Sequence, residues 1–401
     1  MKYIVVLMDG AADTPNAELN GKTPLEAAQK PHIDQLAASG EMGMVTTVPA
    51  GLPPGSDVAN LAVFGYDPLK YYTGRSPLEA VSIGVPLLST DTAFRANVVT
   101  LSDEANFADK TMVDYSADEI STEEAHQLID AVNEGLRTDA YEFFGGTSYR
   151  HLMVWHQCEN AFSLTPPHDI SGRVIGRYLP ADPTLRMLME KSYAILKDHP
   201  VNLARIARGL HPANAIWIWG NGTRPALDSY ETRFGIHGAV ISAVDLIKGI
   251  GHCAGLDVLE VEGATGTVHT NFDGKANAAI EALKNGCSFV YVHLEAADEA
   301  GHRHETENKV KAIELIDQKI VAPIVSYLED ANEAFNMLIL PDHPTPLELM
   351  THTSDPVPYI LYKSRESHPA QAGVRYTEAA GRAAGRTVAE GYTLIQQMFE
   401  C

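Results

Sequence analysis

The stretch KYIVVLMDG spans residues 2–10, and residues 4–8 are apolar without interruption. A strand without alternation is typical of a parallel sheet that is covered on both faces. Similar runs recur later in the chain, at residues 288–294 (SFVYVHL), 335–340 (FNMLIL) and 357–362 (VPYILY). Helical patterns accompany them at residues 276–283, 309–328 and 391–399. Strands that alternate with helices predict an α/β fold with a doubly wound sheet.

The middle of the chain has a different pattern. Strand-like pieces at residues 94–101, 151–155, 215–219 and 239–242 are interspersed with helical stretches at 121–137 and 184–209. A chain of 401 residues is long enough for two domains. We therefore expect a smaller α+β domain at residues 88–262, inserted into a domain that is built from residues 1–87 and 263–401.

Composition excludes several classes of function. The net charge of −22 argues against nucleic acid as a partner, because such proteins present a basic face. No apolar run approaches the roughly 18 residues that span a membrane, and the first run is too short for a signal peptide. The four cysteines form no Cys-x-x-Cys pair, so a zinc ribbon or a disulfide framework is not indicated. The expectation is a cytoplasmic protein.

Metal-competent side chains stand at the ends of the predicted strands. Asp9 follows the first strand, and the others lie in the loops HLEAADEAGH, LPDHPTP and THTSDP, as Asp298, His302, Asp342, His343 and His352. The carboxyl ends of parallel strands meet at one edge of a sheet, where such folds bind ligands. Carboxylates and imidazoles without a thiolate suit Mn²⁺, Zn²⁺ or Mg²⁺, and the three histidines favour the first two.

Ser56 lies in the segment LPPGSDVAN at residues 52–60, where a helix is expected to begin. Two interpretations of this serine are open. It can be the N-terminal cap of the helix. Alternatively, it is a nucleophile that a metal ion activates, with the helix N-terminus favouring an incoming phosphate.

Taken together, these motifs resemble a known family. The segments VVLMDGAAD, PPGSDVANLAVFGYDP, YYTGRSPLEA, HLEAADEAGH, LPDHPTP and THTSDPVPYI are similar to those of the cofactor-independent phosphoglycerate mutases of the archaeal type. That family belongs to the alkaline phosphatase superfamily. The resemblance covers both ends of the chain well and the middle more loosely.

The resemblance implies an alkaline-phosphatase-like fold and an isomerase of glycolysis with two divalent ions, Mn²⁺ foremost and Zn²⁺, Co²⁺ or Mg²⁺ as alternatives. Asp298, His302 and His352 would hold one ion. The second ion would be held by Asp9, Ser56, Asp342 and His343. Ser56 would also take the phosphoryl group from 3-phosphoglycerate and return it to the 2-hydroxyl.

The inserted domain is then expected to supply a lid and a basic clamp for a small anionic phosphorylated substrate. The candidate contacts are Arg150, His151, His168, Asp169, Arg224 and Lys248, together with Arg75 in TGRSPLEA. Arginine suits a two-point grip on a phosphate or a carboxylate.

Two other functions use the same metal-dependent chemistry. One is a mutase-like phosphotransferase that acts as a homoserine kinase, and the other is a metal-dependent phosphatase. The separated cations at Arg150, Arg224 and Lys248 favour a substrate with both a phosphate and a carboxylate, and hence the mutase. The fold alone does not identify the substrate, because one fold can serve many functions.

Overall fold

The computed structural model describes residues 1–158 and 162–400 and divides the chain into two compact units. Unit 1 comprises Met1–Tyr72 and Leu227–Cys401, and unit 2 comprises Thr73–Ala226. The α/β fold and the insertion of one segment into another agree with the expected architecture, whereas the boundaries differ from residues 88 and 262. Each unit has its own apolar core.

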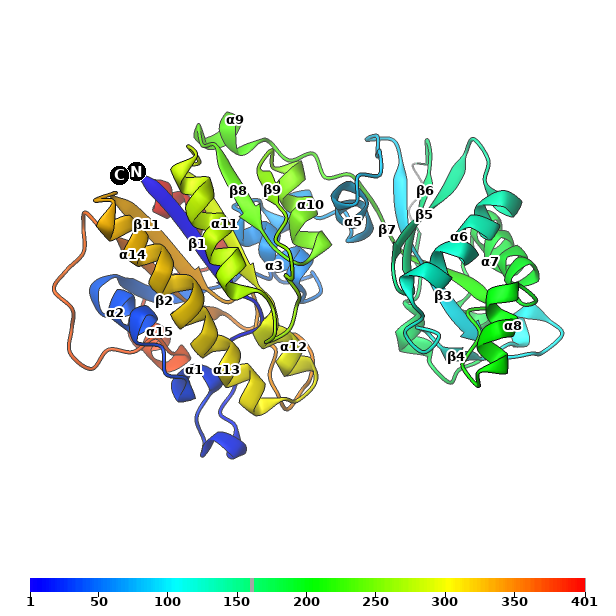
Figure 1. The fold of residues 1–401 in the computed structure, drawn as a ribbon, viewed down its shortest axis with the longest axis horizontal. Coiled ribbons are helices and arrows are strands. Elements are labelled where there is room, and N and C mark those ends of the chain that lie inside the picture. The colour runs from blue at the N-terminus through cyan, green and yellow to red at the C-terminus, as the bar shows by residue number, and fades with distance from the viewer. Residues whose placement is uncertain (159–161, 401) are drawn as a thin grey trace. The chain divides into compact units, whose positions relative to one another are not determined.

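Unit 1 is built on an eight-stranded sheet of order β13-β2-β12-β11-β1-β10-β8-β9 (Figure 1). Its strands are β1 (Lys2–Met8), β2 (Glu41–Val45), β8 (Gly238–Ile241), β9 (Asp257–Leu259), β10 (Phe289–Leu294), β11 (Phe335–Leu340), β12 (Val357–Lys363) and β13 (Thr387–Val388). Its helices are α1 (Pro24–Ala27), α2 (Pro31–Ser39), α3 (Ser56–Val63), α4 (Pro68–Tyr71), α9 (Tyr230–Phe234), α10 (Asp245–Cys253), α11 (Phe272–Lys284), α12 (Ala296–His302), α13 (Thr306–Ile316), α14 (Ala322–Asp330), α15 (Glu378–Ala383) and α16 (Leu394–Phe399).

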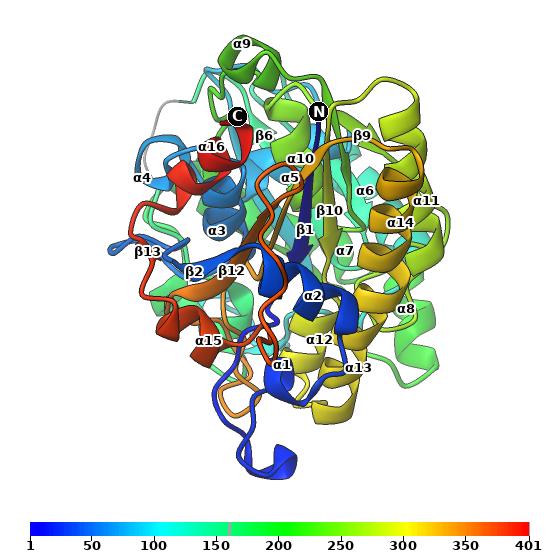
Figure 2. The ribbon, with the colours of Figure 1, turned by 90° about the vertical axis from the view of Figure 1, so that its left-hand side faces the viewer.

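The sheet of unit 1 has helices on both faces, with α11 and α14 on one side and α3 and α16 on the other (Figure 2). Alternate residues of β10 serve the two faces. Val290 packs in the core beneath α11 and α14, whereas Tyr291 stacks on Phe64 and Phe289 contacts Phe399. This double cover explains why the strands read as apolar runs without alternation.

Strand β12 runs against its neighbours β11 and β2, while the other strands of this sheet are parallel to one another. An antiparallel strand begins at the edge where its neighbour ends. The loop between Leu340 and Val357 therefore stays at the carboxyl edge of the sheet, and this loop carries three of the predicted metal ligands, Asp342, His343 and His352.

Unit 2 contains a five-stranded antiparallel sheet in which β3 pairs with β4, β6 and β7, and β5 pairs with β6. The strands are β3 (Thr92–Leu101), β4 (Met112–Asp114), β5 (Tyr141–Thr147), β6 (Arg150–Trp155) and β7 (Ala215–Thr223). The helices are α5 (Ser76–Ser82), α6 (Thr122–Leu136), α7 (Pro183–Leu196) and α8 (Pro200–Ala207). The helical pattern expected at residues 184–209 is divided, because Pro200 begins a new helix.

The unit boundaries differ from the expected ones for two physical reasons. The expected insert included residues 239–242, but residues 239–241 belong to β8, which pairs with β10 and extends the sheet of unit 1. The expected main domain included residues 73–87, but α5 belongs to unit 2, where the Ser76 hydroxyl donates to the Gly220 carbonyl. Long-range pairing of this kind leaves no local signal in a sequence.

Candidate metal centre

The seven predicted metal-binding side chains lie together in unit 1, at the carboxyl edge of its sheet. Asp9 follows β1, Asp298 and His302 lie on α12 after β10, and Asp342 and His343 follow β11. The other two are Ser56, the first residue of α3, and His352, in the loop before β12. The strand ends thus converge as the apolar runs predicted.

One group of side chains surrounds Asp298. His302, one helical turn further along α12, places its Nε2 3.2 Å from Asp298 Oδ2. His352 Nε2 lies 3.5 Å from Asp298 Oδ1 and 2.8 Å from His302 Nε2. Three ligand-type groups therefore face one another within the span of a single metal ion.

A second group surrounds His343. Its Nε2 lies 3.3 Å from Asp342 Oδ2, 3.6 Å from Asp9 Oδ1 and 3.1 Å from Ser56 Oγ. The Ser56 hydroxyl is also 3.5 Å from Asp9 Oδ2. These are the four residues that the resemblance assigned to the second ion.

The two groups adjoin. The rings of His343 and His352 are 4.2 Å apart between centroids. Thr345 Oγ1 donates to Asp298 Oδ1 at 2.5 Å and lies 3.3 Å from His343 Nδ1. His343 belongs to two sets of ligand-type atoms that lie within 4.8 Å of one another, one with Asp9 and Asp342 and the other with Asp298 and His352. The two groups therefore meet at His343.

Ser56 does not cap α3, so the first interpretation of this serine is wrong. The N-cap residue is Gly55, and the helix has no side-chain cap. The Ser56 side chain instead contacts Asp9 and His343. A serine at the first position of a helix, turned toward carboxylate and imidazole groups, fits the role of a nucleophile better than a structural one.

Gly10 allows the loop after β1 to approach its neighbours. Its φ is +61°, and a Cβ atom there would lie 2.5 Å from Asp298 Oδ1. Its backbone N–H donates to Asp342 Oδ1 at 3.1 Å. The Asp-Gly pair thereby fixes Asp9 beside both other loops, which a residue with a side chain would prevent.

The carboxylates differ in their electrostatic surroundings. Burial and the nearby charges of Asp342 and Asp298 raise the pKa of Asp9 well above its usual range. Burial would also raise the pKa of Asp298, but hydrogen bonds from His302 and His352 hold it well below its usual range. The hydrogen bond to Asp298 raises the pKa of His302 to about 9. Three carboxylates this close together call for positive charge.

The donor set fits divalent metal ions. Asp9 Oδ1 is buried and has no hydrogen-bond partner within residues 1–158 and 162–400. A buried carboxylate oxygen without a partner is costly, and a cation would satisfy it. The seven donors are oxygens and imidazole nitrogens, which Mn²⁺, Zn²⁺ and Co²⁺ accept.

Sequence reasoning missed His293, which orients Asp9. His293 is the fifth residue of β10, fully buried, and its Nε2 lies 2.9 Å from Asp9 Oδ2. Its Nδ1 lies 3.1 Å from Ser242 Oγ, and the buried ammonium of Lys275 donates to its carbonyl. Burial lowers the pKa of His293 to about 3, so the ring is neutral. A histidine within an otherwise apolar strand, one residue before its end, is the sequence signal.

Asn60 supports Asp342 in the same way. Its Nδ2 donates to Asp342 Oδ2 and to the Ser56 carbonyl, both at 2.9 Å. Its Oδ1 accepts from the Tyr291 hydroxyl at 2.6 Å. All three side chains are buried, so the chain from Tyr291 to Asp342 is fixed by packing.

Unit 2 contains a cluster of arginines around the buried carboxylate of Glu79, which we call the arginine cluster. Arg75 Nε donates to Glu79 Oε1 at 2.7 Å, and Arg95 donates to both carboxylate oxygens at 2.8 and 2.9 Å. Burial alone would raise the pKa of Glu79, but the two guanidinium groups lower it to about 2. Arg95 is a member that sequence reasoning missed, since it lies within the strand-like run TAFRANVV.

Two further predicted substrate contacts lie near the arginine cluster. His168 packs edge-on against Trp219, and the guanidinium of Arg95 lies 5.1 Å from the centroid of the same ring. Arg150 is exposed and stacks on Tyr149. Burial and the charges of Arg95 and Arg75 lower the pKa of His168, although Asp169 opposes the shift. Four cationic or imidazole groups thus gather on one part of unit 2.

The other predicted contacts are placed differently. His151 is 1% exposed, its Nδ1 accepts from the Gly146 N–H, and its Nε2 has no hydrogen-bond partner in the described part of the chain. Asp169 and Arg224 are exposed. Lys248 lies on α10 in unit 1, not in the insert as expected, and its ammonium contacts Glu260 at 2.7 Å.

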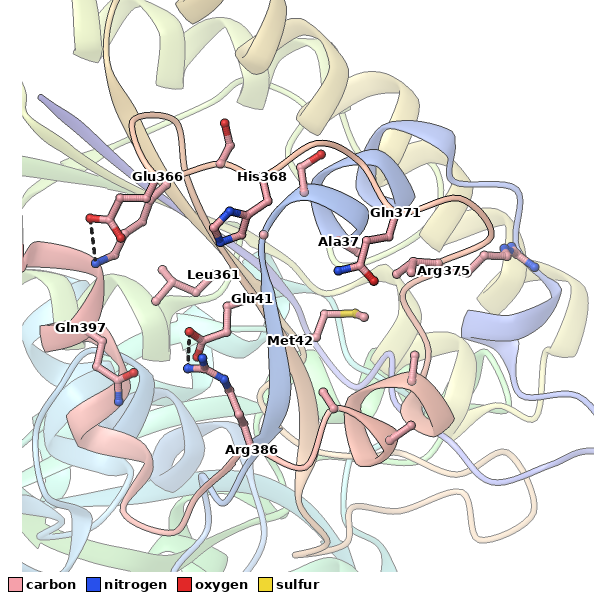
Figure 3. A pocket seen from close by; sticks show the side chains of 18 of the residues that line it. Ala37, Glu41, Met42, Leu361, Glu366, His368, Gln371, Arg375, Arg386 and Gln397 are labelled. Atoms are coloured by element: carbon pink, nitrogen blue, oxygen red, sulfur yellow. Dashed lines mark ion pairs between the residues drawn. The ribbon is translucent and has the colours of Figure 1, made fainter.

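A cavity of about 860 Å³ lies elsewhere in unit 1, against β2, β12 and the segment at residues 364–386. Figure 3 shows its lining, in which Glu41 pairs with Arg386 and Glu366 with Lys363. It contains none of the seven residues of the metal centre. Its charges pair with one another rather than converge on a ligand, so size alone does not make this cavity the functional site.

Three comparisons with known proteins bear on this centre. Residues 37–202 match the profile of the 2,3-bisphosphoglycerate-independent phosphoglycerate mutase family. A protein of Geobacter sulfurreducens, named "Probable 2,3-bisphosphoglycerate-independent phosphoglycerate mutase", is 50% identical over 100% of both chains. The 2,3-bisphosphoglycerate-independent phosphoglycerate mutase of Methanosarcina acetivorans is 50% identical over 94% of both.

Solved structures agree with the sequence relatives. A protein of Pyrococcus horikoshii superposes with a TM-score of 0.81 at 30% identity, covering 99% of this chain and 96% of that one. The cofactor-independent phosphoglycerate mutase of Thermoplasma acidophilum gives a TM-score of 0.67 at 26% identity, with 99% of each chain covered. No helix in the described part of the chain is long and apolar enough to span a bilayer. The chain therefore belongs to the 2,3-bisphosphoglycerate-independent phosphoglycerate mutase family.

Proposed function

We propose that this chain is a cytoplasmic isomerase that interconverts 3-phosphoglycerate and 2-phosphoglycerate, with Ser56 carrying the phosphoryl group during turnover. The observation that carries this proposal is the position of the Ser56 hydroxyl. It lies at the start of α3, 3.1 Å from His343 Nε2 and 3.5 Å from Asp9 Oδ2, and does not cap its helix. Membership of the phosphoglycerate mutase family supplies the substrate.

The seven side chains would hold two divalent ions. Asp298, His302 and His352 would hold one, and Asp9, Ser56, Asp342 and His343 the other, with Mn²⁺ as the first expectation and Zn²⁺, Co²⁺ or Mg²⁺ as alternatives. When bound, such ions neutralise charge on a transferring phosphoryl group and lower the pKa of a coordinated hydroxyl. The buried Asp9 Oδ1, which has no hydrogen-bond partner among the described residues, supports this occupancy.

Ser56 acts as the nucleophile. Its Oγ gives up its proton and attacks the phosphorus of 3-phosphoglycerate, the bond from phosphorus to the 3-oxygen breaks, and that oxygen takes up a proton. In the second half of the reaction, the 2-hydroxyl of glycerate gives up its proton and attacks the phosphoserine, the bond from phosphorus to Ser56 Oγ breaks, and Oγ takes up a proton. The positive end of α3 favours negative charge at this position in both halves.

The arginine cluster of unit 2 would bind the anionic substrate. Arg75 is 41% exposed and Arg150 is exposed, so both can reach a ligand, while Glu79 fixes the guanidinium of Arg95. Guanidinium groups suit carboxylate and phosphate oxygens because they offer two parallel N–H donors. Glycerate must remain bound after the first phosphoryl transfer and until the second. Water must also be excluded during this time, because it would hydrolyse the phosphoserine.

An assay coupled to enolase tests the proposal. Enzyme loaded with Mn²⁺ should convert 3-phosphoglycerate to 2-phosphoglycerate without added 2,3-bisphosphoglycerate. Removal of metal with EDTA should abolish the activity, because three clustered carboxylates would then repel the substrate. Full activity of the metal-free protein would contradict the assignment of the centre.

The same preparation should be given ATP with homoserine and, separately, an aryl phosphate. Phosphohomoserine without any 2-phosphoglycerate would replace the mutase by a kinase while leaving the metal centre in place. Hydrolysis of the aryl phosphate alone would indicate a phosphatase. The proposal expects neither product at a rate comparable to mutase turnover.

A further inference from the structure

Three neighbouring parallel strands of unit 1 begin at the edge of the sheet opposite the metal centre. His237 directly precedes β8, Asp257 is the first residue of β9, and Cys287 lies two residues before β10. One ligand-type atom from each residue can be chosen so that all three lie within 4.8 Å of one another. Within this group, His237 Nε2 lies 3.4 Å from Asp257 Oδ2.

The backbone beneath these side chains is held in place. The His237 carbonyl accepts from the Ser288 N–H at 2.9 Å and from the Ser288 hydroxyl at 3.1 Å. The Lys2 ammonium donates to the Cys287 carbonyl at 3.0 Å and to the Leu283 carbonyl at 2.7 Å. These contacts tie the residues that flank β8 and β10, so two of the three side chains start from a rigid frame.

We propose that His237, Asp257 and Cys287 form a second divalent-metal site, of the zinc class, at the amino edge of the sheet. A thiolate, an imidazole and a carboxylate are the donors that tetrahedral Zn²⁺ accepts, with water in the fourth position. Bond lengths of about 2.0 to 2.3 Å place such ligands roughly 3.5 Å apart. The exposed side chains of His237 and Asp257 can close the small remaining distance.

The donor types separate this site from the metal centre. The seven residues of the metal centre include no sulfur, whereas Cys287 supplies a soft ligand that favours Zn²⁺ or Co²⁺ over Mg²⁺. Cys287 is 6% exposed and its thiol is free. His237 and Asp257 are 59% and 60% exposed, which leaves an open face for water and for entry of the ion.

Another group in the described part of the chain has similar residue types but lacks free acceptors. Asp114 already accepts from the Ser116 N–H, the Ser116 hydroxyl and the Asp118 N–H. Asp118 in turn accepts from the backbone and ring of His211. This group is a hydrogen-bonded turn, while the carboxylate of Asp257 pairs with His237, which is itself a member of the proposed site.

An ion at this site would fasten the edge of the sheet. Strand β9 is three residues long, lies at the end of the strand order and pairs with β8. Ligation by residues that begin β8, β9 and β10 would join the edge strand to two others. The site is therefore a structural one, independent of phosphoryl transfer.

Cobalt substitution tests the proposal, because a bond between sulfur and Co²⁺ gives an intense near-ultraviolet charge-transfer band that oxygen and nitrogen ligands do not give. The metal-stripped full-length protein is titrated with Co²⁺. We expect a band whose final intensity corresponds to one Co²⁺–thiolate site per chain, that Zn²⁺ displaces, and that is absent in Cys287→Ser. Saturation without such a band would overturn the proposal.

Matched cysteine variants identify the sulfur. Cys253→Ser and Cys401→Ser should retain the band, and Ser56→Ala should retain it while losing mutase activity. A band that disappears in Cys401→Ser and persists in Cys287→Ser would assign the sulfur elsewhere and refute the site.

The exposed ligands provide variants that are safe for folding. His237→Asn and Asp257→Asn should each weaken Co²⁺ binding at the thiolate site by at least about 10-fold, measured against a chromophoric chelator, with kcat unchanged. Unchanged affinity in both would leave Cys287 without its partners and would contradict the proposal, even if Cys287→Ser were to misfold.

Discussion

In unit 1, the seven residues of the metal centre are three carboxylates, three imidazoles and one hydroxyl. In unit 2, the arginine cluster places two guanidinium groups on a single partly buried carboxylate, Glu79. The first set is rich in carboxylates, and one of its oxygens, Asp9 Oδ1, has no hydrogen-bond partner in the described part of the chain, so this set suits cations. The second has excess positive charge and suits anions. Under the proposed function, the first set would make and break the bonds to phosphorus, and the second would bind the substrate.

Removing the nucleophile should have the largest effect. Ser56→Ala should lower kcat on the order of 10⁴-fold or more, because it removes the hydroxyl that is proposed to carry the phosphoryl group. The temperature of unfolding should change little, since Ser56 does not cap α3. Enolase-coupled kinetics and calorimetry measure the two quantities. A near-normal kcat in Ser56→Ala would contradict the assignment of phosphoryl transfer to the metal centre of unit 1.

Removing a fixed guanidinium from unit 2 should have the next largest effect. Arg95→Ala should lower kcat/KM by about 10- to 10³-fold, equivalent to about 1.4 to 4 kcal/mol, if Arg95 shapes the anion site. It should also destabilise unit 2 by about 2 to 3 kcal/mol, because Glu79 loses its bidentate partner.

Two controls separate these effects. Arg95→Lys should restore stability more than activity, because an ammonium cannot reproduce the two parallel donors. Arg75→Ala should change stability by less than about 1 kcal/mol, since Arg75 is 41% exposed. Loss of stability with normal kcat/KM in Arg95→Ala would reduce the arginine cluster to a structural element.

A smaller effect is expected at His293, which acts through Asp9. His293→Phe should raise the Mn²⁺ concentration for half-maximal activity by about 10- to 100-fold, with kcat at saturating Mn²⁺ changed much less. The imidazole otherwise holds Asp9 Oδ2 at 2.9 Å. His293→Gln, which retains a polar group, should require a Mn²⁺ concentration between those of the unmodified protein and His293→Phe. An equal loss of kcat at all metal concentrations would show that His293 has a direct role in the reaction.

The smallest effect is expected at His151, which the sequence proposed as a substrate contact and the structure buries. His151→Phe should change kcat and KM by less than about 3-fold and lower stability by about 1 kcal/mol, since the Gly146 N–H loses its acceptor. Steady-state kinetics and thermal unfolding test this. A loss of more than about 10-fold in kcat/KM at unchanged stability would return His151 to the substrate site.

The sequence predicted much of unit 1 because its signals are local. Apolar runs such as residues 2–8 mark parallel strands, and parallel strands bring their ends to one edge whatever the order of pairing. Asp9, Asp298 and Asp342 could therefore be grouped from the order of strands and loops along the chain. His352 lies at the same edge because β12 runs antiparallel to β11. The resemblance of its motif to the family assigned His352 to the centre, whereas the residue pattern alone did not show the direction of β12.

The sequence predicted less of unit 2 because its contacts are distant. Arg95 reads as part of a buried strand until α5 places Glu79 beside it. His151 has the same local signal as its exposed neighbour Arg150, and only the pairing of β6 with β3 and β5 decides which is buried. The boundary at Thr73 likewise depends on where α5 packs. Register and pairing are global properties that residue patterns do not determine.

The central claim is that the metal centre activates Ser56 and that no other group carries the phosphoryl during turnover. Mass spectrometry of enzyme quenched during turnover with 3-phosphoglycerate, with Mn²⁺ and with EDTA, tests this most directly. The account predicts one phosphoryl group on Ser56 in the Mn²⁺ sample and none in the EDTA sample or in Ser56→Ala. A phosphoryl group reproducibly found on another residue, in an enzyme that turns over normally, would contradict it.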